Sequence, residues 1–169
     1  MIIGFDGSRT FIKERTGTEN YSYQLLKTLA KIDHHNLYKI YIRPDLQGVT
    51  LQDWPANFEF KTINWPRLWT QAGLANQTFK DRLDVLFIPA HTSPLIHKPG
   101  LKTVVTVHDL GAEYLPRHHQ LKQLLYLKWI TKFQFKNATK LIAVSESTKK
   151  DLIKRLKCNP SKIKVVYEG

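Results

Sequence analysis

The sequence of 169 residues predicts an α/β domain with three layers, in which helices cover both faces of a mostly parallel sheet of about seven strands. Short runs rich in β-branched residues alternate along the chain with longer segments whose apolar residues recur at helical spacing. In addition, 42% of the residues are hydrophobic and 11% are aromatic, which suits one core of ordinary size. Strands that alternate with helices pair in parallel, because each helix carries the chain back across the sheet.

The first half of the chain predicts a repeated strand-and-helix pattern. After the apolar run at residues 2–6, Tyr21, Leu25 and Leu29 recur every four residues and predict a helix that begins after Thr18. A weaker helical pattern extends from about residue 67 to residue 80. The remaining predicted strands of this half are residues 37–42, 58–63 and 84–88.

The second half continues the same pattern. The β-branched strand 103–107 is followed by a helix over residues 120–137, a strand at 141–144, a helix over 146–156 and a strand at 163–167. No linker or repeat interrupts the sequence, so residues 1–169 are predicted to form a single domain. Because the sequence ends directly after a predicted core strand, we expect it to be one half of a larger protein.

The charge of the chain favours an anionic partner. The formal net charge is +12, and residues 101–169 alone contain 14 basic and 5 acidic residues. Phosphate, nucleic acid and lipid head groups all fit such an excess, and a solvated basic face is the alternative. Nucleic acid is disfavoured because the sequence has no helix-turn-helix, RRM or KH pattern.

Composition also excludes several classes of protein. The single cysteine, Cys158, excludes an internal disulfide and a cysteine-based zinc site, and favours a reducing compartment. No segment has the character of a signal peptide or approaches the roughly 20 apolar residues of a spanning helix. We therefore expect a cytoplasmic protein, with peripheral contact at the cytoplasmic membrane face left open.

Polar residues follow the predicted strands at the points where the strands end. Ligands of open parallel sheets bind outside these carboxyl ends, so the polar residues there form the candidate site. His108 and Asp109 follow strand 103–107, where an imidazole can contact a substrate hydroxyl and the carboxylate can fix the loop. A histidine that caps the strand for structural reasons is the alternative. The other residues of the candidate site at this rim are Gly7, Thr16, Gly17, Thr18, His91, Ser145, Glu146 and Glu168.

Several of these residues also have a structural explanation. Gly17 lets backbone N–H groups at a helix start face a phosphate or sugar oxygen, but Thr16 or Thr18 can equally be a helix N-cap. Ser145 is most simply the N-cap of the next helix, and a structural role is favoured for His91. The sequence has no G-x-G-x-x-G fingerprint, no P-loop and no His, Asp and Glu grouping at metal-ligand spacing, so no cofactor and no metal are expected.

The helix over residues 120–137 carries a second feature. At about 100° per residue, basic residues fall on one arc together with apolar ones, which is typical of a helix that lies on anionic lipid. A helix packed against another domain, with ordinary lysines at its edge, is the alternative. The basic arc contains Lys122, Leu125, Lys128, Trp129, Lys132 and Lys136, and the expected core face contains Leu124, Tyr126, Leu127, Ile130, Phe133 and Phe135.

Four segments carry a family resemblance that covers essentially the whole chain. They are residues 16–21 (TGTENY), 106–110 (TVHDL), 141–148 (LIAVSEST) and 165–169 (VVYEG), and together they resemble the N-terminal half of family 4 (group 1) retaining glycosyltransferases. The resemblance implies a GT-B architecture, in which two Rossmann-like domains face each other across a cleft. The N-terminal domain of such enzymes mainly holds the acceptor, and the C-terminal domain holds the nucleotide sugar without a metal.

The resemblance also implies roles for the candidate residues. The turn Thr16–Gly17–Thr18 would lie near the donor phosphates and the acceptor, and His91 counts among the residues that bind donor or acceptor. His108 would approach the donor sugar hydroxyls while Asp109 supports its loop. Ser145 and Glu146 would line the acceptor side of the cleft, and Glu168 would begin the crossing into the second domain.

Two departures from the family pattern are informative. The family's turn often has a second glycine and an arginine where this chain has Glu19 and Asn20. The family's C-terminal pair of glutamates has no match, so the isolated chain is expected to be inactive and to need a donor-binding domain in cis or in trans. We therefore interpret the chain as the acceptor-binding domain of a glycosyltransferase whose acceptor is a glycan or a lipid-linked molecule. A stand-alone, non-catalytic glycan-binding or scaffold module is the alternative.

Overall fold

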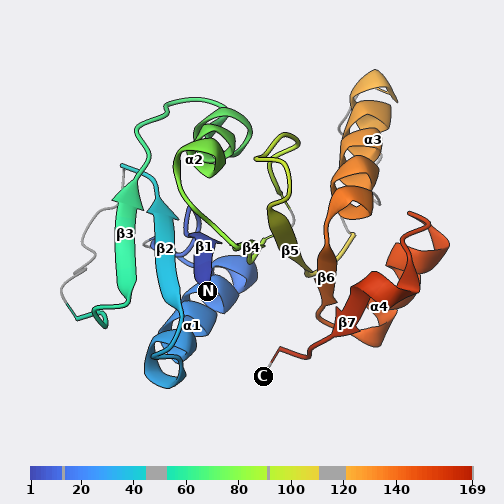
Figure 1. Cartoon of the computed structure of the whole chain (residues 1–169). Coiled ribbons are helices and arrows are strands. Elements are labelled where there is room, and N and C mark those ends of the chain that lie inside the picture. The colour runs from blue at the N-terminus through green and yellow to red at the C-terminus, as the bar shows by residue number, and fades with distance from the viewer. Residues whose placement is uncertain (13, 45–52, 91, 111–120, 169) are drawn as a thin grey trace.

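The computed structural model describes residues 1–12, 14–44, 53–90, 92–110 and 121–168, of which residues 121–128 are described by their backbone alone. The described residues form an α/β domain around one seven-stranded sheet, which confirms the predicted fold class (Figure 1). All six strand pairings are parallel. The strands are β1 (Ile2–Asp6), β2 (Leu37–Ile42), β3 (Phe58–Thr62), β4 (Val85–Ile88), β5 (Lys102–Val107), β6 (Lys140–Ala143) and β7 (Ile163–Val165).

The order of the strands places β1 at the point where the sheet changes direction. The order is β3-β2-β1-β4-β5-β6-β7, so the chain first builds outward through β2 and β3 and then continues from the other side of β1. Residue Phe5 of β1 is paired with Ile40 of β2 and with Phe87 of β4. Because ligands of such sheets bind at this switch point, the carboxyl ends of β1 and β4 are the expected location of a site.

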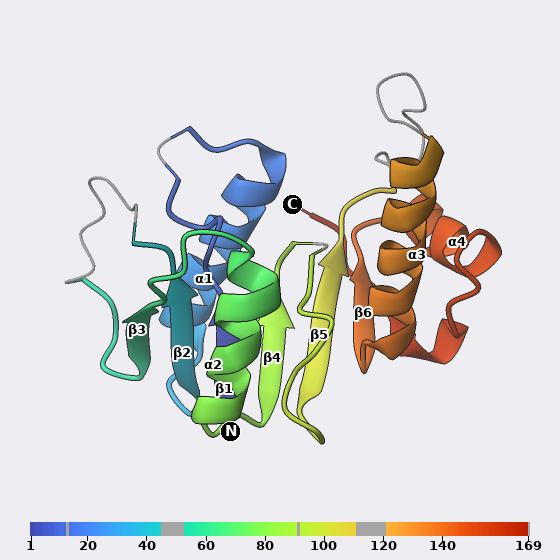
Figure 2. The same ribbon diagram turned by 90° about the horizontal axis from the view of Figure 1, so that it is seen from above.

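Four α-helices cover the two faces of the sheet in the described part of the chain. The helices α2, α3 and α4 lie on one face and α1 lies on the other, and each face has its own cluster of buried apolar side chains (Figures 1 and 2). The core contains fully buried side chains such as Phe5, Ile40 and Leu141 from the strands and Leu26 and Leu152 from the helices. The helices are α1 (Gly17–Ile32), α2 (Ala75–Lys80), α3 (Leu121–Asn137) and α4 (Glu146–Lys154), with a short 3-10 helix at Pro160–Lys162.

The helical segment predicted over residues 67–80 differs most from the expectation. It begins as a π-helix, Trp69–Leu74, and becomes α-helical only at α2. The Trp69 indole N–H donates to the backbone oxygen of Ile63 at 3.1 Å, and a Cβ on Gly73 would lie 2.9 Å from the Ile63 side chain. These two close contacts fix the segment against residues 63–65. Leu68, directly before it, has the left-handed backbone conformation, with φ of 53°.

Asp81, at the C-terminal end of α2, ties this helix to two strands. It is only 7% exposed, and it accepts hydrogen bonds from Tyr41 at 2.7 Å, from Gln77 at 2.9 Å and from Lys61 at 3.0 Å. Burial acts to raise the pKa of the Asp81 carboxyl, but the hydrogen bonds from Gln77, Tyr41 and Lys61 outweigh burial and lower this pKa to about 2.

No helix in the described part of the chain is long and apolar enough to cross a membrane.

The Asp81 network predicts a stability that depends on pH. The pKa of Asp81 is lowered in the folded state, so its contribution to stability is complete above the ordinary carboxyl pKa and is lost as the pH falls through about 2. We expect Asp81→Asn to lower the free energy of unfolding by roughly 2 kcal/mol at neutral pH, with a gap that narrows below about pH 4. Chemical denaturation over a pH series measures this gap. The control is Asp53→Asn, at an exposed aspartate, and an equal gap at every pH would contradict the prediction.

Candidate functional site

His108 lies at the carboxyl end of β5 and connects two neighbouring segments. Its Nε2 lies 2.8 Å from the backbone oxygen of Pro89, which follows β4, and its Nδ1 lies 2.6 Å from the carboxylate of Glu168. A carbonyl and a carboxylate both only accept hydrogen bonds, so the two contacts are satisfied together when both ring nitrogens carry hydrogen. The structure therefore brings His108 and Glu168, which are 60 residues apart in sequence, into direct contact at this edge.

Tyr21 brings the first helix to the same place. Its ring meets the His108 ring edge-on, with the centroids 4.9 Å apart, and its hydroxyl lies 3.5 Å from the Thr106 hydroxyl. Burial raises the pKa of the Tyr21 hydroxyl, and the nearby Glu168 carboxylate raises this pKa further. The N-terminal turn of α1 and His108 are thus two parts of one structural unit.

The turn Thr16–Gly17–Thr18 forms the start of α1. Thr16 is the N-cap, and its backbone N–H and its hydroxyl both contact the carboxylate of Glu19, as in a capping box. Arg9 donates to the other oxygen of Glu19 at 3.0 Å. Burial acts to raise the pKa of Glu19, but the hydrogen bonds from Thr16 and Arg9 outweigh burial and lower it. Glu19 stands where the glycosyltransferases that this chain resembles often have glycine. Its carboxylate instead binds the guanidinium of Arg9.

The remaining candidates have different positions. The Ser145 hydroxyl accepts the Thr148 N–H at 3.0 Å and so caps α4, while the Thr148 hydroxyl donates to the backbone oxygen of His108 at 3.1 Å. This contact joins α4 to the His108 loop. Glu146 and Asp109 are exposed at the same edge. His91 lies outside the described residues.

The structure describes the side chains of α3 only from residue 129 onward, so it places only part of the predicted basic arc. Trp129 and Phe133 are 59% and 40% exposed, and their rings stack with centroids 5.5 Å apart. The expectation that Phe133 lies in the core is wrong, because one helical turn places it beside Trp129. Lys132 and Lys136 are on the same helix, whereas the side chains of Lys122, Leu125 and Lys128 lie outside the described part of the chain.

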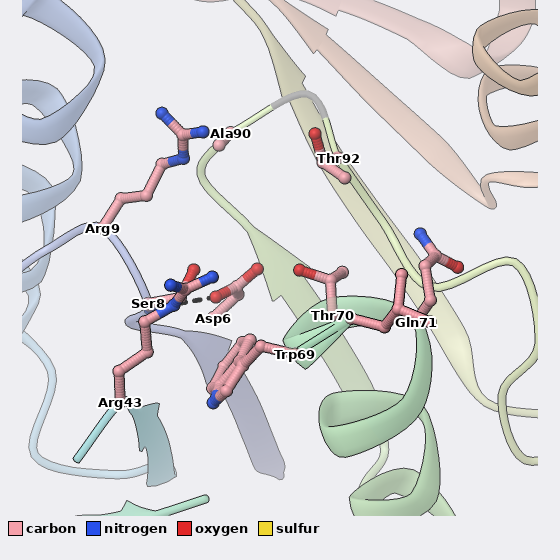
Figure 3. Close-up of a pocket in the computed structure, with 10 residues that line it drawn as sticks. Asp6, Ser8, Arg9, Arg43, Trp69, Thr70, Gln71, Ala90 and Thr92 are labelled. Carbon is pink, nitrogen blue, oxygen red and sulfur yellow. Dashed lines mark hydrogen bonds between the residues drawn. The ribbon is translucent and has the colours of Figure 1, made fainter. Parts of the chain in front are cut away.

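A pocket of about 290 Å³ opens at the switch point of the sheet (Figure 3). Asp6, the last residue of β1, is 4% exposed at this pocket, and its carboxylate accepts the Ser8 N–H at 3.0 Å. Most of these residues are not among the predicted site residues, although Asp6 and Arg43 stand at strand ends, where polar residues predict a site. The lining residues are Asp6, Ser8, Arg9, Arg43, Leu68, Trp69, Thr70, Gln71, Ala90 and Thr92.

Comparison with known proteins identifies the family. The sequence matches Glycosyltransferase Family 4 over residues 15–169. The chain belongs to glycosyltransferase family 4. Its fold is similar to that of sucrose-phosphate synthase from Thermosynechococcus elongatus, with a TM-score of 0.67 and 13% sequence identity. That similarity covers 99% of this chain and 48% of the synthase, so this family 4 chain spans about half the length of the enzyme and corresponds to the N-terminal half of a GT-B fold. No curated protein sequence matches it.

The described residues of this family 4 domain offer no metal centre. Within them, no three His, Cys, Asp or Glu side chains come together in a group that holds a metal ion.

Two glycines at this edge predict opposite responses to substitution. A Cβ on Gly17 would meet nothing within 4 Å, whereas a Cβ on Gly7 would lie 2.9 Å from the backbone oxygen of Tyr41. We expect Gly17→Ala to leave the free energy of unfolding unchanged or to raise it by about 0.4–1 kcal/mol. Gly7→Ala should lower it by about 1–3 kcal/mol, because the neighbouring strand must move. Urea denaturation measures the free energy of unfolding of both variants. Equal changes in the two variants would contradict the prediction.

Proposed function

We propose that this chain is the acceptor-side domain of a retaining glycosyltransferase, which transfers a sugar from a nucleotide sugar to a hydroxyl group. The observation that carries the proposal is the position of His108, at the carboxyl edge of the sheet in a family 4 domain, in contact with both α1 and the C-terminal segment. The acceptor would bind at this edge. A donor-binding domain, in cis or in trans, would supply the other side of the cleft.

His108 is the proposed catalytic residue because an imidazole at this edge can contact the hydroxyl groups of the donor sugar, as the family resemblance implies. A side chain that is held in a fixed position there orients the sugar for transfer. The backbone oxygen of Pro89 contacts one ring nitrogen of His108, and the Tyr21 ring packs edge-on against the His108 ring. Glu168 occupies the other nitrogen, so a substrate oxygen that reaches His108 must replace this carboxylate.

The proposed role of His108 predicts a loss of transfer. In a protein that contains both halves, His108→Ala should lower kcat by about 100-fold, because the loss of a contact that orients the reacting sugar costs about this much. Release of nucleoside diphosphate measures turnover, and denaturation checks that the variant folds. His35→Ala, at an exposed histidine far from this edge, is the matched control. Unchanged turnover in His108→Ala would remove His108 from the mechanism.

We also propose that α3 contacts an anionic membrane surface, which suits a lipid-linked acceptor. The stacked and exposed rings of Trp129 and Phe133 supply an apolar contact, and Trp is favoured at head-group depth. Lys132 and Lys136 are spaced one turn apart on the same helix. Basic side chains at such a surface contribute about 1 kcal/mol each toward binding anionic lipids.

Charge reversal on α3 tests the membrane contact. The double variant Lys132→Glu/Lys136→Glu should bind vesicles of phosphatidylglycerol and phosphatidylcholine at least about tenfold more weakly than the unmodified chain. Lys31→Glu/Lys80→Glu changes the charge equally at exposed positions on α1 and α2 and should bind as the unmodified chain does. Co-sedimentation measures the affinities. Equal binding by both double variants would reject α3 as the membrane face.

A further inference from the structure

We propose that the pocket at the end of β1 selects an acceptor that carries an anionic group, a phosphate or a carboxylate, next to its hydroxyl groups. The proposal rests on the proposed function only in calling this ligand the acceptor. The pocket volume, about 290 Å³, lies near the lower limit of roughly 300 Å³ that is usual for ligand sites. It therefore suits a small polar molecule such as a charged monosaccharide.

Arg43 supplies the cation of the pocket. It follows β2 directly, and its guanidinium lies beside Ser8 and Asp6, as Figure 3 shows. The guanidinium stands 5.7 Å from the centroid of the buried Trp69 ring, which places the charge above an aromatic face. Among the described residues, no carboxylate lies within salt-bridge distance of Arg43. Its donors are therefore available to an anionic ligand, which a guanidinium binds with a two-pronged geometry.

Arg9 places a second guanidinium at the same pocket. One of its nitrogens, Nη1, is held by Glu19 at 3.0 Å, while the side chain remains 54% exposed. A guanidinium has five N–H donors, so a single carboxylate contact leaves further donors for a ligand. Because Glu19 is itself fixed by Thr16 at the start of α1, Arg9 is held in position before a ligand arrives.

Asp6 disfavours an anionic ligand that has no hydroxyl group to donate to its carboxylate. Its carboxylate is almost fully buried between these arginines, and among the described residues it receives hydrogen bonds from Ser8 alone. A buried carboxylate favours a hydroxyl donor and repels an anion. The best ligand therefore presents a hydroxyl to Asp6 and its negative group to Arg43, and the two groups must belong to one molecule.

The opposite wall of the pocket consists of irregular backbone. Leu68, in the left-handed conformation, and the π-helix that begins at Trp69 bring Thr70 to the pocket. Such strained and π-helical segments occur preferentially at functional sites. The side chain of Gln71, in contrast, is used to hold the segment at Ser93 and Leu95. Two hydrogen bonds of Gln71 thus hold this wall, which lines the same pocket as the two arginines.

Ligand titration of the 169-residue chain tests the proposal without any donor. The probes are glucose 6-phosphate, glucuronate, glucose and inorganic phosphate, followed by NMR or calorimetry. We expect at least one of the two anionic sugars to bind at least tenfold more tightly than glucose and than inorganic phosphate. Tighter binding of glucose 6-phosphate identifies a phosphate group as the preferred anion, and tighter binding of glucuronate identifies a carboxylate. Equal binding of glucose and both anionic sugars, or no binding of either anionic sugar, would overturn the proposal.

Variants separate the roles of the two charges. Arg43→Ala should weaken the anionic sugar at least tenfold and leave glucose unchanged, while Arg82→Ala, an exposed arginine just before β4 at the other end of the strands, should change neither. Asp6→Asn keeps the shape of the side chain and should remove the preference for the anionic sugar over inorganic phosphate. An Arg43→Ala variant that binds as tightly as the original chain would reject the pocket as the anion site.

These results are independent of the proposed function. A two-domain protein that transfers sugar while its pocket shows no anion preference would reject this pocket and leave the glycosyltransferase proposal standing. A chain that binds the anionic sugar through Arg43, in a protein that transfers no sugar, would confirm the pocket and reject the transfer reaction.

Discussion

The pairing of β1 with β2 on one side and β4 on the other is the constraint on which the rest of the structure depends. Because the chain leaves β1 in one direction and returns on its other side, the loops after β1 and β4 diverge and leave space between them. Gly7 allows the loop after β1 to pass close to β2, with its N–H bonded to the Tyr41 oxygen at 2.8 Å. The position of Asp6 and of the pocket follows directly from this pairing.

The same edge is stabilised by contacts between segments that are far apart in sequence. Tyr21 of α1 packs on His108 of the β5 loop, and Thr148 of α4 donates to the His108 backbone. Glu168 closes the group from the C-terminal segment. His108 is consequently a junction of three elements as well as the proposed catalytic residue, so its structural and catalytic interpretations are compatible.

Most of the fold follows from local patterns, but the pocket does not. The strands 2–6 and 37–42 coincide with β1 and β2, because β-branched and aromatic runs specify strands that are buried on both faces. The π-helix at Trp69 has no sequence signature, since it depends on tertiary contacts with Ile63. His108 was predictable from its place after a strand, whereas its contact with Glu168 depends on how the last segment crosses the sheet.

Glu19 departs from the family pattern, and a residue from another element compensates its charge. The resemblance places a glycine and an arginine where this chain has Glu19 and Asn20, and a carboxylate at a phosphate-binding turn would repel the ligand. The structure shows that this carboxylate is buried and neutralised by Arg9, which reaches it from the loop after β1. The guanidinium of Arg9, from the loop after β1, therefore lies at this turn. Because Arg9 also lines the pocket, the helix cap and the pocket share one charge network.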